Sequence, residues 1–188
     1  MPTRKQLYLE TWGCQMNVLD SELVLGQLRS MGYERTDDVS AADVVLLNTC
    51  SVRQHAEEKV YSRLGELRKA KKAKPDMIVG VIGCMAERDH KGIQTRAPHV
   101  DLLCGPGNLN QIPGLIAEVE STRQRAIALE RDHSRKTDAA RRTLLYDSIE
   151  ALDQSRMPEA ISRSGQAYVR VQRGCDKFCT FCVVPFTR

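Results

Sequence analysis

The sequence has no long apolar run. None of the apolar segments in its 188 residues approaches the ~20 residues that a bilayer-crossing helix needs. Residues 1–6 lead straight into a short strand-like run and show no signal peptide. Internal repeats and low-complexity tracts are also missing, and 41% hydrophobic with 28% charged residues is an ordinary globular balance. These absences exclude a membrane-spanning protein and general disorder, and they favour a cytoplasmic location.

A strong charge of one sign is also missing. The 28 Lys and Arg residues against 24 Asp and Glu residues leave a net charge of +4. That surplus permits an RNA partner without requiring one. The one dense basic run is residues 68–74, at the end of a predicted helix. We interpret this run as a solvated helix end, which cations favour, in preference to a phosphate-binding patch.

The seven cysteines are an odd number, and nothing indicates secretion, so a disulfide framework is a poor interpretation. Cys175, Cys179 and Cys182 follow the spacing C-x3-C-x2-C. Three thiolates on one loop can hold three corners of a four-iron cluster and leave the fourth iron open to a small molecule. The alternative is a structural zinc site, which needs four protein ligands, and no fourth Cys or His lies nearby.

The first ~120 residues alternate apolar strands with amphipathic helices. Strands are predicted at residues 7–12, 42–47, 77–82, 100–104 and 125–129, and again at 167–172. Helices are predicted from Asp20 or Ser21 to Gly32, over residues 53–74, and over residues 110–121. This alternation predicts an α/β fold, a parallel sheet with helices on both faces.

Three further cysteines follow the ends of three different predicted strands. These are Cys14, Cys50 and Cys84. Right-handed crossovers place all the strand ends on one edge, where open α/β sheets bind ligands, so the three thiols are expected to converge. Taken singly, each is more often a buried apolar thiol, and a disulfide pair among them would leave the third unexplained. Cys104 also lies near a strand end, and we assign it to packing.

Amide side chains flank these cysteines. Gln15, Asn17 and Asn48 can donate hydrogen bonds to sulfide or thiolate, or can serve equally well in turns and helix caps. Gly13 and Gly83 precede two of the cysteines and allow a close backbone approach. No side chain is predicted as an acid, base or nucleophile.

The loop that carries Cys175, Cys179 and Cys182, with Phe181 just before the last cysteine, resembles the corresponding loop of the radical S-adenosylmethionine enzymes. In that family the open iron binds the amino and carboxylate groups of S-adenosylmethionine. An electron from the cluster then cleaves the sulfonium to a 5′-deoxyadenosyl radical. The resemblance implies that Cys175, Cys179 and Cys182 hold this cluster and that Phe181 lies at the cofactor.

Four blocks in the same order resemble the methylthiotransferase branch of that family. They are residues 13–22, 48–53, 83–84 and 171–188. The resemblance implies that Cys14, Cys50 and Cys84 hold a second, auxiliary [4Fe-4S] cluster that carries the transferred sulfur. It also implies a methylthiotransferase domain at 4–120, a linker at 121–163, and the start of a truncated radical S-adenosylmethionine (β/α) barrel at 164–188.

The implied whole enzyme is a monomer that adds a methylthio group at C2 of an isopentenyl-adenosine beside the tRNA anticodon. It needs tRNA, two [4Fe-4S] clusters, S-adenosylmethionine, an electron donor and a sulfur source, and the 188 residues alone are expected to be inactive. One alternative is a sister methylthiotransferase acting on threonylcarbamoyl-adenosine tRNA or on a ribosomal-protein aspartate. The alternative of another class is a non-enzymatic iron–sulfur or zinc module that binds RNA.

Overall fold

The computed structural model describes residues 4–51, 54–130, 150–154, 156, 168–172, 174–175 and 177–187. Its strands are β1 (Gln6–Trp12), β2 (Glu34–Arg35), β3 (Val44–Thr49), β4 (Ile78–Gly83), β5 (Leu102–Cys104) and β6 (Ala126–Ala128). Its α-helices are α1 (Gln15–Ser30), α2 (Gln54–Ala73), α3 (Cys84–Arg88), α4 (His90–Arg96) and α5 (Ile112–Thr122). Two 3-10 turns are η1 (Pro106–Gln111) and η3 (Val184–Phe186).

The six strands form one parallel sheet in the order β2-β1-β3-β4-β5-β6. Every residue of β3 and β4 is buried, which is why both strands read as continuous apolar runs in the sequence. The predicted α/β class with a parallel sheet is confirmed. Since all the strands run the same way, their carboxyl ends meet at one edge.

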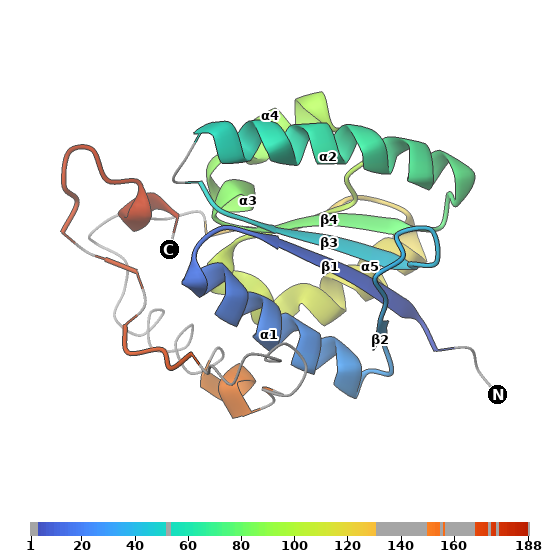
Figure 1. The fold of residues 1–188 in the computed structure, drawn as a ribbon, viewed down its shortest axis with the longest axis horizontal. Coiled ribbons are helices and arrows are strands. Elements are labelled where there is room, and N and C mark those ends of the chain that lie inside the picture. Colours follow the sequence, from blue (N-terminus) through green and yellow to red (C-terminus); the bar gives the residue numbers. More distant parts are fainter. Residues whose placement is uncertain are drawn as a thin grey trace.

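Helices cover both faces of the sheet (Figure 1): α1 and α5 lie on one side, and α2 and α4 on the other. Each face of the sheet has its own hydrophobic core, and alternate residues of β3 point into one core or the other. Val44 and Leu46 pack with α1 and α5, whereas Val45 and Leu47 pack with α2, α3 and α4. Among the described helices, none combines the length and apolar character that crossing a bilayer requires.

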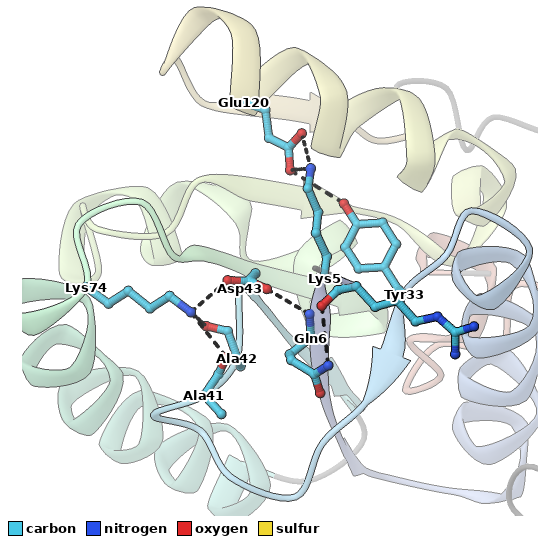
Figure 2. A network of polar contacts seen from close by, with 9 residues as sticks. Lys5, Gln6, Tyr33, Ala41, Ala42, Asp43, Lys74 and Glu120 are labelled. Atoms are coloured by element: carbon cyan, nitrogen blue, oxygen red, sulfur yellow. Dashed lines mark hydrogen bonds and ion pairs between the residues drawn. The ribbon is translucent and has the colours of Figure 1, made fainter. Parts of the chain in front are cut away.

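Ion pairs secure the edge of the sheet where the strands begin (Figure 2). The Lys74 ammonium lies 2.7 Å from Asp43 and also donates to the Ala42 carbonyl. Burial alone would raise the pKa of Asp43, but the hydrogen bonds from Lys74 and from the Gln6 N–H, with the charges of Lys74 and Lys5, together outweigh burial and lower that pKa. Lys71 pairs with Asp101. Two cations of the basic run thus hold the fold together, while Arg68, Lys69 and Lys72 are exposed.

The first helix begins earlier than predicted. It starts at Gln15, directly after Cys14, so Asp20 and Ser21 lie inside the helix and are buried instead of capping it. The helices α3 and α4, the short strand β2 and the turn η1 were not predicted. The predicted last strand is confirmed as β6, so the sheet extends past residue 120.

The predicted linker lies mostly outside the described residues, but parts of the later chain rest on the sheet domain. Residues 150–154 are helical, and Leu152 is buried in the core beside α1. Tyr168 packs against the same core. The strand predicted at 167–172 is wrong for its described part, because residues 168–172 pair with no described strand. Their sides still alternate, with Tyr168 and Arg170 half-buried and Val169 and Val171 exposed.

Candidate metal centre

Three strand ends stand in one row at the carboxyl edge of the sheet. Trp12 pairs in register with Thr49, and Thr49 pairs with Gly83. Because neighbouring strands lie about 4.8 Å apart, the row spans roughly 10 Å. Cys50 and Cys84 directly follow two of these residues, and Cys14 comes two residues after the third. The structure thus brings the three predicted cysteine segments together.

The three thiols differ in their exposure to solvent. Cys14 is exposed, whereas Cys50 and Cys84 are buried. Throughout the described part of the chain, no group of three or more Cys, His, Asp or Glu side chains is arranged to hold a metal ion. The Cys14 sulfur instead lies 3.4 Å from the Asn17 side-chain oxygen, to which its S–H donates. A thiolate ligand at Cys14 would give up this contact, since it has no proton to donate.

Asn17 and Asn48 form a fully buried amide pair between α1 and β3. The Asn17 amide donates to the Asn48 side-chain oxygen at 2.9 Å and to the Thr49 carbonyl at 3.2 Å. The Asn48 amide donates to the Asn17 carbonyl at 2.7 Å and to the Ser21 hydroxyl at 2.8 Å. The amide nitrogens of this pair all donate to oxygen atoms, and in the described part of the chain its contact with sulfur is the Asn17 oxygen that accepts from Cys14. Gln15 is exposed and has no hydrogen-bond partner among the described residues.

Asn17 also sets where α1 begins. Its side-chain oxygen accepts a hydrogen bond from the Cys14 backbone N–H, while its own backbone N–H donates to the Cys14 carbonyl at 3.0 Å. This reciprocal arrangement is the kind that starts a helix, with Cys14 at the capping position. Cys14 is therefore held at the first turn of α1, over the ends of β1 and β3.

Glycines allow the cysteine backbones to approach this pair. Gly83 has φ +91, and a Cβ there would lie 2.5 Å from the Asn48 side-chain oxygen and 2.7 Å from the Thr49 carbonyl. A Cβ on Gly13 would lie 2.9 Å from the Cys50 Cβ. Three thiols on backbones packed this closely are a donor set that suits an iron–sulfur cluster. The residues fit the implied group in chemistry, and their segments lie side by side, but in the described structure their thiols are not gathered as a metal ion would need.

An arginine ties two of the cysteine segments together. Arg88 in α3 donates from Nε to the Ser51 hydroxyl at 3.1 Å and pairs with Glu57 of α2. Ser51 follows Cys50, and α3 begins at Cys84. Arg88 was not predicted from the sequence, because only a helix that starts at Cys84 places Arg88 one turn away, and no helix was predicted there.

Cys104 lies outside the row. It pairs in register with Ile82, one step inside the sheet from Gly83. It is completely buried, its S–H donates to the Asn108 carbonyl at 3.2 Å, and burial raises its pKa above the usual range of a thiol. These surroundings suit a packed, neutral thiol.

The second triad lies on a separate loop. Cys175 and Cys182 are half-buried and Cys179 is exposed, with the Cys182 N–H donating to the Cys179 carbonyl at 2.9 Å. Phe181 is 96% exposed. In Figure 1 this red segment lies at the left, toward the end of the sheet where α1 and α2 begin.

Residues 6–105, which span β1 to β5 and contain Cys14, Cys50 and Cys84, match the model of the family described as "Uncharacterized protein family UPF0004". The chain belongs to this family. UPF0004 accounts for more than half of the chain and ends before the second triad.

Relatives of this UPF0004 chain carry one shared name, tRNA-2-methylthio-N(6)-dimethylallyladenosine synthase. A Rhodopirellula baltica protein is 48% identical over 186 residues, 98% of this chain and 38% of that protein. An Alcanivorax borkumensis protein is 44% identical over 98% of this chain and 38% of that protein. A Photorhabdus laumondii protein is 41% identical over 100% of this chain and 36% of that protein. The chain therefore spans less than two fifths of these relatives, and the predicted methylthiotransferase resemblance is confirmed.

Proposed function

We propose that this chain is part of an enzyme that methylthiolates tRNA at an isopentenylated adenosine, as its relatives are named for. The observation that carries the proposal is the row of Cys14, Cys50 and Cys84 segments within a chain 40–48% identical to those relatives. The proposed enzyme is a cytoplasmic monomer that takes electrons and sulfur from partners. The relatives' name favours the isopentenyl substrate over a threonylcarbamoyl-adenosine or a ribosomal-protein aspartate.

Two groups of ligands follow from this proposal. Cys14, Cys50 and Cys84 would hold an auxiliary [4Fe-4S] cluster, and Cys175, Cys179 and Cys182 would hold the other. When bound, the clusters with S-adenosylmethionine supply a sulfur site and the one-electron chemistry that activates a C–H bond too weakly acidic for a base.

The chain's own residues position and shield these groups. The Asn17–Asn48 pair holds the start of α1 against β3, and Gly83, just before Cys84, approaches that pair closely because it has no side chain. Arg88 fastens the Cys50 loop to α3 through Ser51. Gln15 is exposed beside Cys14, where its amide can face a substrate. Phe181 is exposed on the second loop, where its ring can cover the bound cofactor.

Anaerobic reconstitution with iron and sulfide tests this assignment. Iron would be counted, and Mössbauer spectra recorded, for the chain and for two triple variants, Cys14/Cys50/Cys84→Ala and Cys175/Cys179/Cys182→Ala. We expect about eight irons in the chain and about four in each variant. Cys104→Ala is the matched control and should keep the full count.

Loss of all iron with either triple variant would mean one shared site and would contradict the two-cluster assignment. Zinc bound in place of iron would favour the non-enzymatic module instead. The substrate is tested in the longer protein that contains this chain, by mass spectrometry of anticodon stem-loops. Methylthiolation of isopentenyl-adenosine, and not of threonylcarbamoyl-adenosine, is the expected result. The 188 residues alone are expected to give no product.

A further inference from the structure

A buried carboxylate on α1 has its counter-ion far along the chain. The Glu22 side chain is 2% exposed, and the Arg156 Nε lies 2.7 Å from its Oε2. The Arg156 side chain is itself 15% exposed. A carboxylate at this depth is strongly destabilising unless it is paired. The pair therefore joins the helix that begins after Cys14 to a residue 134 positions later.

The same guanidinium holds a second element. Arg156 donates from a terminal nitrogen to the Tyr168 carbonyl, so one side chain bridges α1 and the backbone of residues 168–172. The planar fork of an arginine can serve two such acceptors at once, because its separate nitrogens donate in different directions. A neighbouring ion pair, Arg170 with Asp153, ties the same segment to residues 150–154.

Packing gives the segment a defined face. Leu152 is 8% exposed within the core beside α1, and the Tyr168 ring packs against that core. Val169 and Val171 point the other way and are 81% and 92% exposed. Residues 168–172 therefore lie on the α1 side with one face inward and Arg156 beneath them.

The bridge lies between the two cysteine groups. Along α1, Cys14 is eight residues from Glu22, which is about 12 Å at helical rise. Cys175 is seven residues from Tyr168, at most about 25 Å of extended chain. A contact that holds Tyr168 on α1 therefore limits the distance between the Cys175, Cys179 and Cys182 loop and the segments of Cys14, Cys50 and Cys84.

We propose that Arg156 is a positioning residue that locks residues 168–172 onto α1 and so restricts the separation of the two cysteine triads. The lock itself stands on the contacts of Glu22, Arg156 and Tyr168. Its consequence for two metal centres rests on the proposed function.

The test is a distance measurement that needs neither cluster. Nitroxides attached through a ketone-bearing unnatural residue at Val169 and at Met31, both exposed, leave all seven cysteines native. Pulsed dipolar EPR should give one narrow distance distribution for the wild-type chain. Arg156→Gln should broaden it at least twofold, because the shorter, neutral amide cannot pair with Glu22 and span to the Tyr168 carbonyl.

Glu22→Gln keeps the length of the side chain and an acceptor oxygen, so it serves if Arg156→Gln does not fold, and it should also broaden the distribution. The double variant Glu22→Gln/Arg156→Gln should be no broader than the worse single variant. Arg68→Gln, at an exposed arginine of α2, is the matched control and should leave the distribution unchanged. An unchanged width in Arg156→Gln or Glu22→Gln, or additive broadening in the double variant, would overturn the lock.

Activity then reports the consequence separately. In the longer protein, Arg156→Gln should lower kcat at least tenfold while KM for S-adenosylmethionine and the iron content stay unchanged. Unchanged kcat with a broadened distance distribution would overturn the functional consequence and leave the lock standing. Absence of product from the wild-type protein would count against the proposed function alone.

Discussion

At the scale of single residues, Asn48 carries the contacts that hold the start of α1 to β3. It accepts a hydrogen bond from Asn17 and donates two others, to the Asn17 carbonyl and the Ser21 hydroxyl. Only an amide offers a donor and an acceptor in this shape. An aspartate there could not donate, and a leucine would leave the surrounding polar groups unpaired.

Asn48→Ala is therefore expected to destabilise the chain by about 1–3 kcal/mol for each buried partner left unsatisfied. Urea unfolding measures the change. Gln15→Ala, at an exposed amide beside the same site, is the control and should change the stability by less than about 0.5 kcal/mol. A loss below about 1 kcal/mol for Asn48→Ala would show that water replaces these contacts.

His99 is held in its neutral form. Its Nε2 lies 2.7 Å from the Leu64 carbonyl and donates to it, which leaves Nδ1 as a buried nitrogen with no hydrogen-bond partner among the described residues. Burial lowers the pKa of His99, and the nearby Lys71 and Arg68 lower it further. Protonation would place a second N–H in a site without an acceptor.

Between the two pKa values of His99, its side chain binds a proton in the unfolded chain and not in the folded chain. As the pH is lowered below an ordinary histidine pKa of about 6.5, the free energy of unfolding should decrease. The decrease should stop once the pH is below the lowered pKa that His99 has in the folded chain. Unfolding free energies at pH 7.5 and pH 5.5 should differ more for the wild type than for His99→Gln, which keeps a donor for Leu64. Between pH 7.5 and 9 the two should follow the same slope. Equal slopes in the acidic window would contradict this account.

At the scale of elements, the junction of β4 and α3 depends on Gly83. The positive φ there turns the chain at once into the helix that begins with Cys84. The bare Cα also faces Asn48 and the Thr49 carbonyl at distances no Cβ tolerates. Backbone conformation and packing thus both require glycine at this junction.

Gly83→Ala should cost about 3 kcal/mol or more, from strain at positive φ and from overpacking. Gly65→Ala is the matched control, because Gly65 lies within α2 and no described atom lies within 4 Å of its would-be Cβ. That change should stabilise the chain by about 0.5–1 kcal/mol. Thermal or urea unfolding of both variants checks the opposite signs, and a neutral Gly83→Ala would refute the close approach.

At the scale of the whole molecule, the sheet and nearly all of both cores lie within residues 4–130. Of the later residues that the structure describes, Leu152 and Tyr168 join a core. Removing residues 131–188 would expose the surface under Leu152 and leave Glu22 buried without Arg156.

We expect the 4–130 segment to unfold cooperatively but with a free energy of unfolding lower by about 3 kcal/mol or more. Glu22→Gln in that segment should recover part of the loss, because it removes the unpaired buried charge. Circular dichroism melts of the three chains measure both effects. Unchanged stability on truncation would mean that the later residues do not rest on α1 in solution.

The fold class, and the edge of the sheet where three cysteine segments meet, were predictable from the pattern of residues along the chain. Buried parallel strands such as β3 and β4 have no solvent face, so they appear as plain apolar runs, and parallel connections send every strand end to one edge. Ligation of iron by these cysteines stays a prediction.

The start of α1, and the burial of Asp20, Ser21 and Glu22 within it, depend on contacts made in three dimensions. Short polar groups that cap a helix and polar groups buried within one are chemically alike, so local sequence cannot tell them apart. Ser21 bonds with Asn48, which lies 27 residues away. Glu22 bonds with Arg156, which lies 134 residues away. No periodicity or spacing encodes contacts at those separations, because they arise from how packed elements meet.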